Sequence, residues 1–142
     1  MKVGLVSCVS KKKKGKHRAE DLYTSPLFIW SRAYVKRYYD KYFILSAKHY
    51  LVKPDQEIEF YNETLIGKTA IAKKAWAEET FRQILKAIKP DQTTLFIHVG
   101  MTYRKYLVPL LQAVGYKIEI PLAGLRIGEQ LSWYDKQTRY AC

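Results

Sequence analysis

Three short apolar runs, each followed at once by a polar loop, constrain the fold of this chain more than any other feature. The runs cover residues 3–8, 42–46 and 94–99. A continuous apolar run bounded by a polar loop is typical of a strand buried in a parallel sheet. A fourth segment, residues 116–120, alternates apolar and polar side chains and is therefore predicted to be an outer strand.

Amphipathic segments separate these strands and are predicted to be helices. Ser25 and Pro26 have the residue types of an N-cap and a first helical position, so a helix is predicted from there to about residue 39. Pro109 is expected either to kink a later helix or to mark a late start for it. The other predicted helices cover residues 67–88, 100–115 and 127–135, and the polar stretches 10–21 and 47–61 are predicted to be connections.

The spacing of apolar residues predicts which side of each helix is buried. In the first helix these residues are Leu27, Trp30, Ala33 and Tyr34. In the second helix they are Ile71, Ala75, Thr80, Phe81, Ile84, Leu85 and Ile88, and in the third they are Leu107, Leu110, Leu111 and Val114.

The alternation of strands and helices predicts the fold class. Parallel strands joined by right-handed helical crossovers are the most economical arrangement of such a pattern. We therefore expect an α/β fold, a three-layer Rossmann-like domain with a mostly parallel sheet of about four to five strands. The 142 residues fit one compact domain and leave little room for a second, so residues 1–142 are predicted to form a single α/β domain.

The charge of the chain is the strongest indication of its partners. It has 25 basic and 13 acidic residues, a formal net charge of +12, together with 12 tyrosines, 3 tryptophans and 5 phenylalanines. Such a combination suits a nucleic-acid surface, because phosphates pair with Lys and Arg while bases stack on aromatic rings. DNA or RNA is the predicted partner. A nucleotide or another phosphorylated small molecule, and a merely solvated basic face, are the alternatives.

Cysteine and histidine usage gives no sign of a metal site or a disulfide framework. The two cysteines are Cys8 and Cys142, and His17, His49 and His98 form no close pair, so neither structural zinc nor any cofactor is predicted. The acidic residues are too scattered to suggest a Mg²⁺ cluster. No apolar run approaches the roughly 20 residues that span a bilayer, so a cytoplasmic protein without a membrane partner is expected.

The loops that follow the three predicted strands hold most of the reactive side chains. In open α/β sheets, ligands bind outside the carboxyl ends of the strands, near a topological switch point. Parallel strands would open all three loops onto one edge of the sheet. The polar residues there are Ser7, Cys8, Ser10, Lys11 and Lys13 after the first strand, Ser46, Lys48 and His49 after the second, and Gly100, Tyr103 and Arg104 after the third.

Four of these residues are the catalytic candidates. The lysines after Cys8 would favour its reactive thiolate, with a small buried residue at a strand end as the ordinary alternative. Lys48 would act as a nucleophile or base at a partly desolvated site, and His49 would shuttle protons; a surface cation and a structural histidine are the alternatives. Ser10, together with the binding candidates Ser7 and Ser46, would orient reacting groups by hydrogen bonds.

The remaining candidates would bind the ligand or a nucleic acid. Gly100 permits a tight turn into a helix whose N–H groups, with Arg104, would face an anion. Tyr23 would stack a base and Arg32 would reach back to the strand ends, although packing and surface roles explain both residues as well. The full set is Ser7, Lys11, Lys13, Tyr23, Ser25, Arg32, Ser46, Gly100, Tyr103, Arg104, Arg126 and Gln130.

Several of these residues lie in motifs that resemble a known family. The motifs are SCVSKKK at residues 7–13, AEDLYTSPLF at 19–28 and YFILSAKH at 42–49. They resemble a bacterial and phage domain family of unknown function with the pattern SCSKxK…LYxSxLF…YILSAKHGL, although Tyr50 stands where that family commonly has Gly. More distantly, the chain is similar to the peroxide-stress protein YaaA, which implies DNA binding. It is also similar to the core domain of archaeosine synthase, which implies action on a deazaguanine base of tRNA.

These observations lead to one main hypothesis and two alternatives. The main hypothesis is a nucleic-acid-directed enzyme that acts on a nucleobase or its glycosidic bond in DNA or RNA. One alternative is a non-catalytic DNA- or RNA-binding module in stress or phage biology. The other is an enzyme that acts on a nucleotide or another small phosphorylated ligand at the same edge of the sheet.

Overall fold

The central sheet contains all four predicted strands. The computed structural model describes residues 1–7 and 11–139, with side chains to residue 137, and within them a five-stranded sheet has the order β4-β3-β1-β6-β7. Strands β1 (Lys2–Ser7), β3 (Lys41–Ser46), β6 (Thr94–His98) and β7 (Lys117–Glu119) are parallel, and β4 (Tyr50–Val52) is antiparallel to β3. The expected mostly parallel sheet is confirmed, with β1 at its centre.

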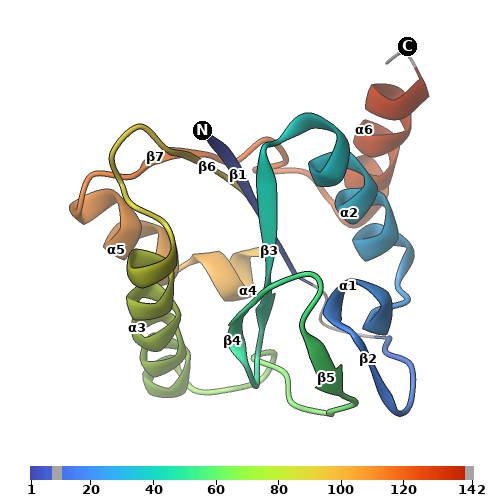
Figure 1. Ribbon diagram of the computed structural model, residues 1–142, viewed down its shortest axis with the longest axis horizontal. Helices are drawn as coiled ribbons and strands as arrows, with labels where there is room; N and C mark the ends of the chain where they lie inside the picture. The colour runs from blue at the N-terminus through green and yellow to red at the C-terminus, as the bar shows by residue number, and fades with distance from the viewer. Residues whose placement is uncertain (8–10, 140–142) are drawn as a thin grey trace.

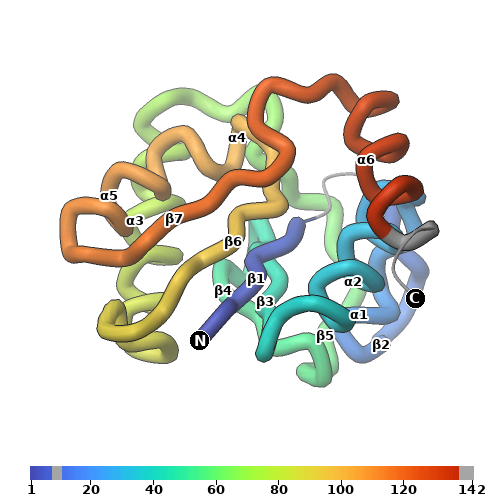
Figure 2. Tube along the Cα trace, turned by 90° about the horizontal axis from the view of Figure 1, so that it is seen from above, coloured from blue at the N-terminus to red at the C-terminus, as the bar shows by residue number. Residues whose placement is uncertain are grey.

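Helices cover both faces of the sheet, which gives three layers (Figure 1). Figure 2 shows α2 (Pro26–Tyr38) and α6 (Ile127–Arg139) on one side, with α3 (Ala70–Ala87), α4 (Met101–Arg104) and α5 (Leu107–Ala113) on the other. Side chains of β1 alternate between the layers, because Val3 and Leu5 belong to the core under α3 and α5 whereas Val6 belongs to the core under α2. The expected three-layer α/β arrangement is therefore confirmed.

Local signals set the start of two helices. The N–H of Phe28 donates to Ser25 Oγ at 3.3 Å, so Ser25 is the N-cap of α2, as predicted. The helix predicted over residues 100–115 is broken after α4. Its second part, α5, has Pro109 in its first turn, where a missing N–H costs no intrahelical hydrogen bond.

The predicted buried face of α2 is wrong. The buried residues are Phe28, Ser31 and Val35, whereas Leu27, Trp30 and Tyr34 are partly buried and Ala33 is exposed. The reason is that α2 is covered on two sides: the sheet takes one, and α6 takes the other, where Tyr34 packs against Trp133 and Tyr134. Tyr34 of the predicted stripe therefore belongs to this second contact and not to the face that covers the sheet.

The predicted faces of the helices on the opposite layer are partly confirmed. Thr80, Ile84, Ile88, Leu107 and Leu111 are buried. The exceptions lie at helix ends or on the solvent side: Ala75 is exposed, and the exposed fractions are 81% for Ile71, 36% for Leu85 and 42% for Val114. Trp76 and Ala77 are buried in place of the exposed residues of α3.

Two connections predicted from polar composition contain short regular elements. Residues 10–21 include β2 (Lys16–Arg18) and α1 (Ala19–Leu22), and residues 47–61 include β4 and β5 (Glu57–Glu59). In the described part of the chain, β2 and β5 pair antiparallel as a separate two-stranded sheet. Three-residue strands are too short to show an alternating pattern, so only their pairing with a distant segment defines them.

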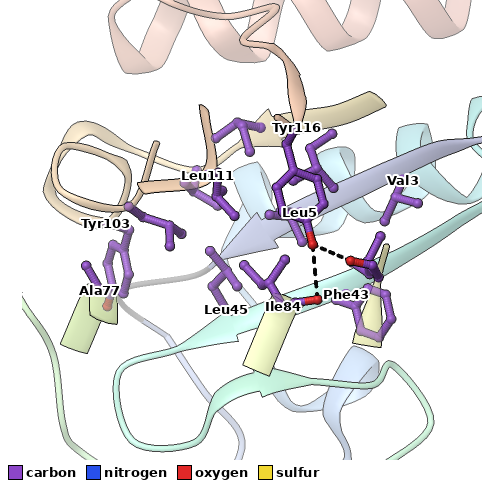
Figure 3. Close-up of a cluster of buried hydrophobic side chains, with 14 of the residues drawn as sticks. Val3, Leu5, Phe43, Leu45, Ala77, Ile84, Tyr103, Leu111 and Tyr116 are labelled. Carbon is purple, nitrogen blue, oxygen red and sulfur yellow. Dashed lines mark hydrogen bonds between the residues drawn. The ribbon is translucent and has the colours of Figure 1, made fainter. Parts of the chain in front are cut away.

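Figure 3 shows the core between the sheet and the layer of α3, α4 and α5. Leu5 and Leu45 of the sheet meet Ile84 of α3 and Leu111 of α5 in this cluster. The hydroxyl of Tyr116 donates to the backbone carbonyls of Ile84 and Ile88, which satisfies acceptors at the carboxyl end of α3. The layer is thereby fixed at the amino-terminal edge of the sheet, while loops occupy the carboxyl edge.

Gly4 of β1 gives a direct test of this packing. A Cβ at Gly4 would lie 2.8 Å from Cδ2 of Tyr39 and 3.0 Å from Cγ1 of Val35, closer than side chains pack. We expect Gly4→Ala to lower the free energy of unfolding by about 1–3 kcal/mol in urea denaturation, because the Tyr39 ring must shift. Gly128→Ala in α6, where a Cβ meets nothing within 4 Å, is the matched control and should not destabilise the protein. Equal effects of the two substitutions would contradict the tight contact over β1.

Candidate nucleobase site at the switch point

The chain leaves the neighbouring strands β1 and β6 toward opposite faces of the sheet. After β1 it reaches β3 through α2 on one face, and after β6 it enters α4 on the other (Figure 2). Such a divergence is a topological switch point, where open α/β sheets hold their ligands. Because β1, β3 and β6 are parallel, the loops that follow them open onto one edge, as predicted.

A cavity of about 440 Å³ lies at this point, and we call it the switch-point cavity. Its walls come from the ends of β1 and β6, the first turns of α2 and α6, and α4. Its volume is typical of a small-molecule site, and most of its walls are apolar. The lining residues are Ser7, Ser25, Pro26, Leu27, Ser31, Ile97, His98, Val99, Gly100, Arg104, Leu122, Ile127, Gln130, Leu131 and Tyr134.

Five predicted binding residues meet in this cavity: Ser7, Ser25, Gly100, Arg104 and Gln130. Nη1 of Arg104 donates to the carbonyl of Val99 at 2.9 Å, and burial lowers the pKa of its guanidinium. Nε2 of Gln130 donates to the carbonyl of Leu125 at 2.9 Å, which orients its Oε1 as an acceptor. The cavity therefore combines guanidinium donors and an amide acceptor with apolar walls.

The sequence did not predict the rest of the cavity wall. His98 was not among the predicted site residues, yet it lines the cavity with 8% of its surface exposed. Tyr134 and Leu122 come from the far end of the chain and belong to no motif. One signal existed, because Gln130 and Tyr134 are four residues apart and so lie on the same face of α6.

Arg126 stands beside the cavity without lining it. It is exposed and immediately precedes α6, and its backbone N–H donates to Glu129 Oε1 at 3.0 Å. The first turn of α6 therefore carries its own carboxylate, so this helix start does not favour a bound anion. The predicted role of Arg126 in binding a ligand or a nucleic acid stays a prediction.

The loop after β3 is organised around Ser46. Its buried Oγ accepts the N–H groups of Lys48 at 3.2 Å and His49 at 2.9 Å, and donates to the hydroxyl of Tyr61 at 2.9 Å. That hydroxyl lies 2.6 Å from the hydroxyl of Tyr23. The expected role of Ser46 in orienting groups is thus exerted on its own loop, which it folds into a tight turn.

Lys48 and His49 lie on this turn, outside the lining of the switch-point cavity. Lys48 is exposed and borders an open hollow of about 500 Å³ together with Tyr61 and Lys68. His49 is half-buried with its ring edge-on to Tyr61. Burial, and next the charge of Lys48, lower the pKa of His49, while Glu63 opposes them. His49 is therefore a neutral proton acceptor at neutral pH.

Three other predicted binding residues are engaged within the fold. Tyr23 and Tyr103 are each only 2% exposed, so the predicted stacking of a base on Tyr23 is wrong for this conformation. Hydrophobic packing decides both positions: Tyr23 contacts Phe28, and Tyr103 contacts Trp76. Arg32 donates to the carbonyl of Glu20 at 2.6 Å, which directs its guanidinium to α1 and not to the strand ends.

The lysine segment, which we define as residues 11–14, is held against the end of α1. The N–H of Lys13 donates to the carbonyl of Leu22 at 2.8 Å, and Lys12 places its ammonium 4.5 Å from the ring centre of Tyr61. Lys11, Lys13 and Lys14 are exposed. The segment therefore presents several positive charges to solvent near the loop after β3. The catalytic candidates Cys8 and Ser10 lie outside the described residues.

Ser46 offers a test of how this loop is built. Ser46→Ala removes one acceptor shared by two N–H groups and one donor to Tyr61, so we expect the free energy of unfolding to fall by about 1–3 kcal/mol in urea denaturation. Ser132→Ala, at an exposed position of α6, is the matched control and should stay within about 0.5 kcal/mol of the wild type. A loss of the same size in both variants would show that the Ser46 network does not stabilise the loop.

The described residues contain no group of three or more His, Cys, Asp or Glu side chains placed to hold a metal ion. In the same part of the chain, no helix is long and apolar enough to cross a membrane.

Comparison with known proteins places the chain in a family. A family of unknown function, DUF6884, matches residues 3–136. The protein described as "Uncharacterized protein YfjM" of Bacillus subtilis (strain 168) is 33% identical over 93 residues, which is 66% of this chain and 61% of that protein. No solved structure matches. The family match covers nearly all of the chain, including every residue that lines the switch-point cavity. The chain therefore belongs to the DUF6884 family.

Proposed function

We propose that this protein binds DNA or RNA and receives a single nucleobase in the switch-point cavity, where the base or its glycosidic bond is the target of its chemistry. The observation that carries this proposal is the shared position of two features. The mostly apolar cavity and the lysine segment both follow β1 at the carboxyl edge of the sheet. One suits a flat, weakly polar ring, and the other suits the phosphates attached to it.

The cavity has the chemistry to hold a base. Its apolar walls would cover the ring, while Arg104 donates and Gln130 Oε1 accepts hydrogen bonds at the ring edge. A base inside a duplex or stem cannot reach such a cavity while stacked. The nucleotide must therefore be extruded, which requires contacts that hold the flanking backbone.

Exposed cations supply these backbone contacts. Lys11, Lys13 and Lys14 of the lysine segment and Lys48, just after β3, are all exposed residues of the loops at the carboxyl edge of the sheet. Neutralising phosphates with such side chains releases counterions, which makes binding strong at low salt and independent of sequence. The formal net charge of +12 supports the same partner.

The environments of His49 and Lys48 favour different roles. Lys48 is exposed, so it lacks the desolvation that activates a lysine nucleophile, and we assign it to phosphate contact. His49 is half-buried and neutral, which suits acid/base work on the nucleotide that the loop after β3 would contact. The more distant resemblance of the chain to YaaA and to the archaeosine synthase core domain favours a DNA or tRNA substrate.

A nucleotide or other small phosphorylated ligand is the second candidate. It is favoured by the cavity itself, which gathers Arg104 and the first turn of α2 without needing a polymer. Tight competition by a mononucleotide, with weak affinity for every polymer, would select this candidate.

Capture of a base can be measured with an oligonucleotide duplex that carries one 2-aminopurine. Stacking quenches this base, so we expect its fluorescence to rise when the protein binds and extrudes it. Ile127→Trp should abolish the rise without abolishing duplex binding, because Ile127 lines the cavity and is 67% exposed, which lets the larger ring enter without disturbing the core. Ile71→Trp is the control, at a helical position outside the lining that is 81% exposed. An unchanged rise with Ile127→Trp would rule out this cavity as the base site.

A further inference from the structure

A chain of hydrogen-bonded side chains runs from the wall of the switch-point cavity into the interface of α2 and α6. The hydroxyl of Tyr134, a cavity-lining residue, lies 2.7 Å from Nδ1 of His98. Nε2 of His98 lies 2.6 Å from the hydroxyl of Tyr39, whose ring packs edge-on against the ring of Tyr34. Tyr134 and His98 are buried, whereas Tyr39 is partly exposed, so the chain connects the cavity wall with solvent.

The surroundings of the chain hold it in place and keep charges away. The ring of Tyr39 stacks on Phe96 with centres 4.4 Å apart, and the ring of His98 lies 5.5 Å from that of Tyr34 and 6.3 Å from that of Trp133. The titratable groups that face His98 from α2 and α6 are thus phenols. Burial lowers the pKa of His98 to about 4, so the ring is neutral at physiological pH.

A neutral imidazole between two hydroxyl groups has two equivalent ways to bond. One ring nitrogen carries a proton and donates, and the other accepts. With Nδ1–H, His98 donates to Tyr134 and accepts from Tyr39; with Nε2–H, both bonds reverse direction. Each tautomer therefore corresponds to one direction of the whole chain, and passing one proton along the chain converts one tautomer into the other.

We propose that this chain is a proton relay between solvent at Tyr39 and the ligand in the switch-point cavity. To deliver a proton, Tyr134 gives its hydroxyl proton to the ligand and takes the Nδ1 proton of His98. Tyr39 then gives its hydroxyl proton to Nε2 and takes a proton from water. One proton enters and one leaves, so no residue keeps a charge, and the reverse sequence removes a proton from the ligand.

The relay adds a proton-transfer step to the proposed function. It rests on that proposed function only for the identity of the ligand. It assigns proton exchange with the ligand to Tyr134 and makes His98 and Tyr39 positioning residues that act through it. Chemistry on a base or a glycosidic bond needs a proton moved to or from a ring nitrogen or leaving group. A relay supplies that proton while the cavity stays closed to bulk water.

The tautomer of His98 can be read directly by NMR of the intact protein labelled with ¹⁵N-histidine, assigned by the signals missing from His98→Asn. We expect both ring nitrogens of His98 to lie between the protonated and unprotonated values at neutral pH. Tyr134→Phe should shift the ring to the Nε2–H form and Tyr39→Phe to the Nδ1–H form, because a buried donor without an acceptor is tolerated less than a bare lone pair. Tyr38→Phe, on the same helix but outside the chain, should leave the averaged signals unchanged.

A single fixed tautomer of His98 in the wild type would overturn the relay. This result comes from the wild-type protein and does not depend on whether any variant folds. Unchanged signals in both folded relay variants would overturn it as well. Because the measurement uses no nucleic acid, its outcome is separate from that of the 2-aminopurine experiment. Averaged tautomers without base capture would leave the relay standing and reject the nucleobase as its ligand.

Discussion

Acidification from pH 7 to pH 4 is expected to remove about 3 kcal/mol of unfolding free energy through His98 alone. Burial lowers the pKa of His98 in the folded protein from 6.5 to about 4. Between these values the unfolded chain binds a proton that the folded chain does not, so protons favour unfolding. The contribution is fully present above pH 6.5, declines as the pH falls, and is lost near pH 4.

The measurement is urea denaturation of the wild type and His98→Asn at several pH values between 7 and 4. The variant starts less stable, because Tyr39 and Tyr134 lose their shared partner. Its stability should then fall less steeply, so the gap between the two proteins should narrow by about 3 kcal/mol. Carboxylates titrate in both proteins and cancel in this comparison. A constant gap would mean that His98 is not buried as a neutral ring.

Removing the charges of the lysine segment is expected to weaken nucleic-acid binding and flatten its salt dependence. For each phosphate that the protein no longer neutralises, the slope of log affinity against log salt should decrease by roughly 0.9 for duplex DNA and 0.7 for a single strand. The test variant carries Lys11→Gln, Lys13→Gln and Lys14→Gln, all at exposed positions. If each of these lysines neutralises one phosphate of duplex DNA, the slope should decrease by about 2.7.

The matched control carries Lys86→Gln, Lys89→Gln and Lys117→Gln. These residues are exposed: Lys86 and Lys89 lie at and just after the end of α3, and Lys117 begins β7, so all three lie toward the amino-terminal edge of the sheet. The net charge changes by the same amount in both variants, which isolates position from total charge. An equal decrease of affinity and slope in both variants would show a diffuse effect of net charge and contradict a phosphate-binding edge.

The central strands and the ligand-binding edge were predictable because each depends on contiguous residues. A buried parallel strand is one apolar run, and a polar loop at its end identifies the edge without knowledge of strand order. The N-cap Ser25 was predictable for the same reason, since the cap and the N–H it accepts are three residues apart. This locality is why Ser7, Gly100 and Arg104 could be predicted to lie near one another, and all three line the same cavity.

The rest of the fold and of the candidate site depends on which distant segments pack together. The periodicity of the sequence does not reveal those contacts. The stripe of α2 that faces α6 is as apolar as the one that faces the sheet, so the sequence could not separate them. Tyr23 is aromatic like a stacking platform, yet its hydroxyl finds a buried partner in Tyr61. Tyr134 reaches the cavity only because α6 returns to the sheet, so its role follows from topology.

Photochemical cross-linking locates a bound base most directly. A single-stranded oligonucleotide with one 5-iodouracil, bound at low salt and irradiated, would attach to the nearest aromatic side chain, which mass spectrometry identifies. If the base enters the switch-point cavity, the cross-link should fall on Tyr134 or its neighbours in α6 and should disappear with Ile127→Trp. Cross-links confined to Phe60 or other aromatic residues beside the lysine segment would place the base outside the cavity and contradict the proposal.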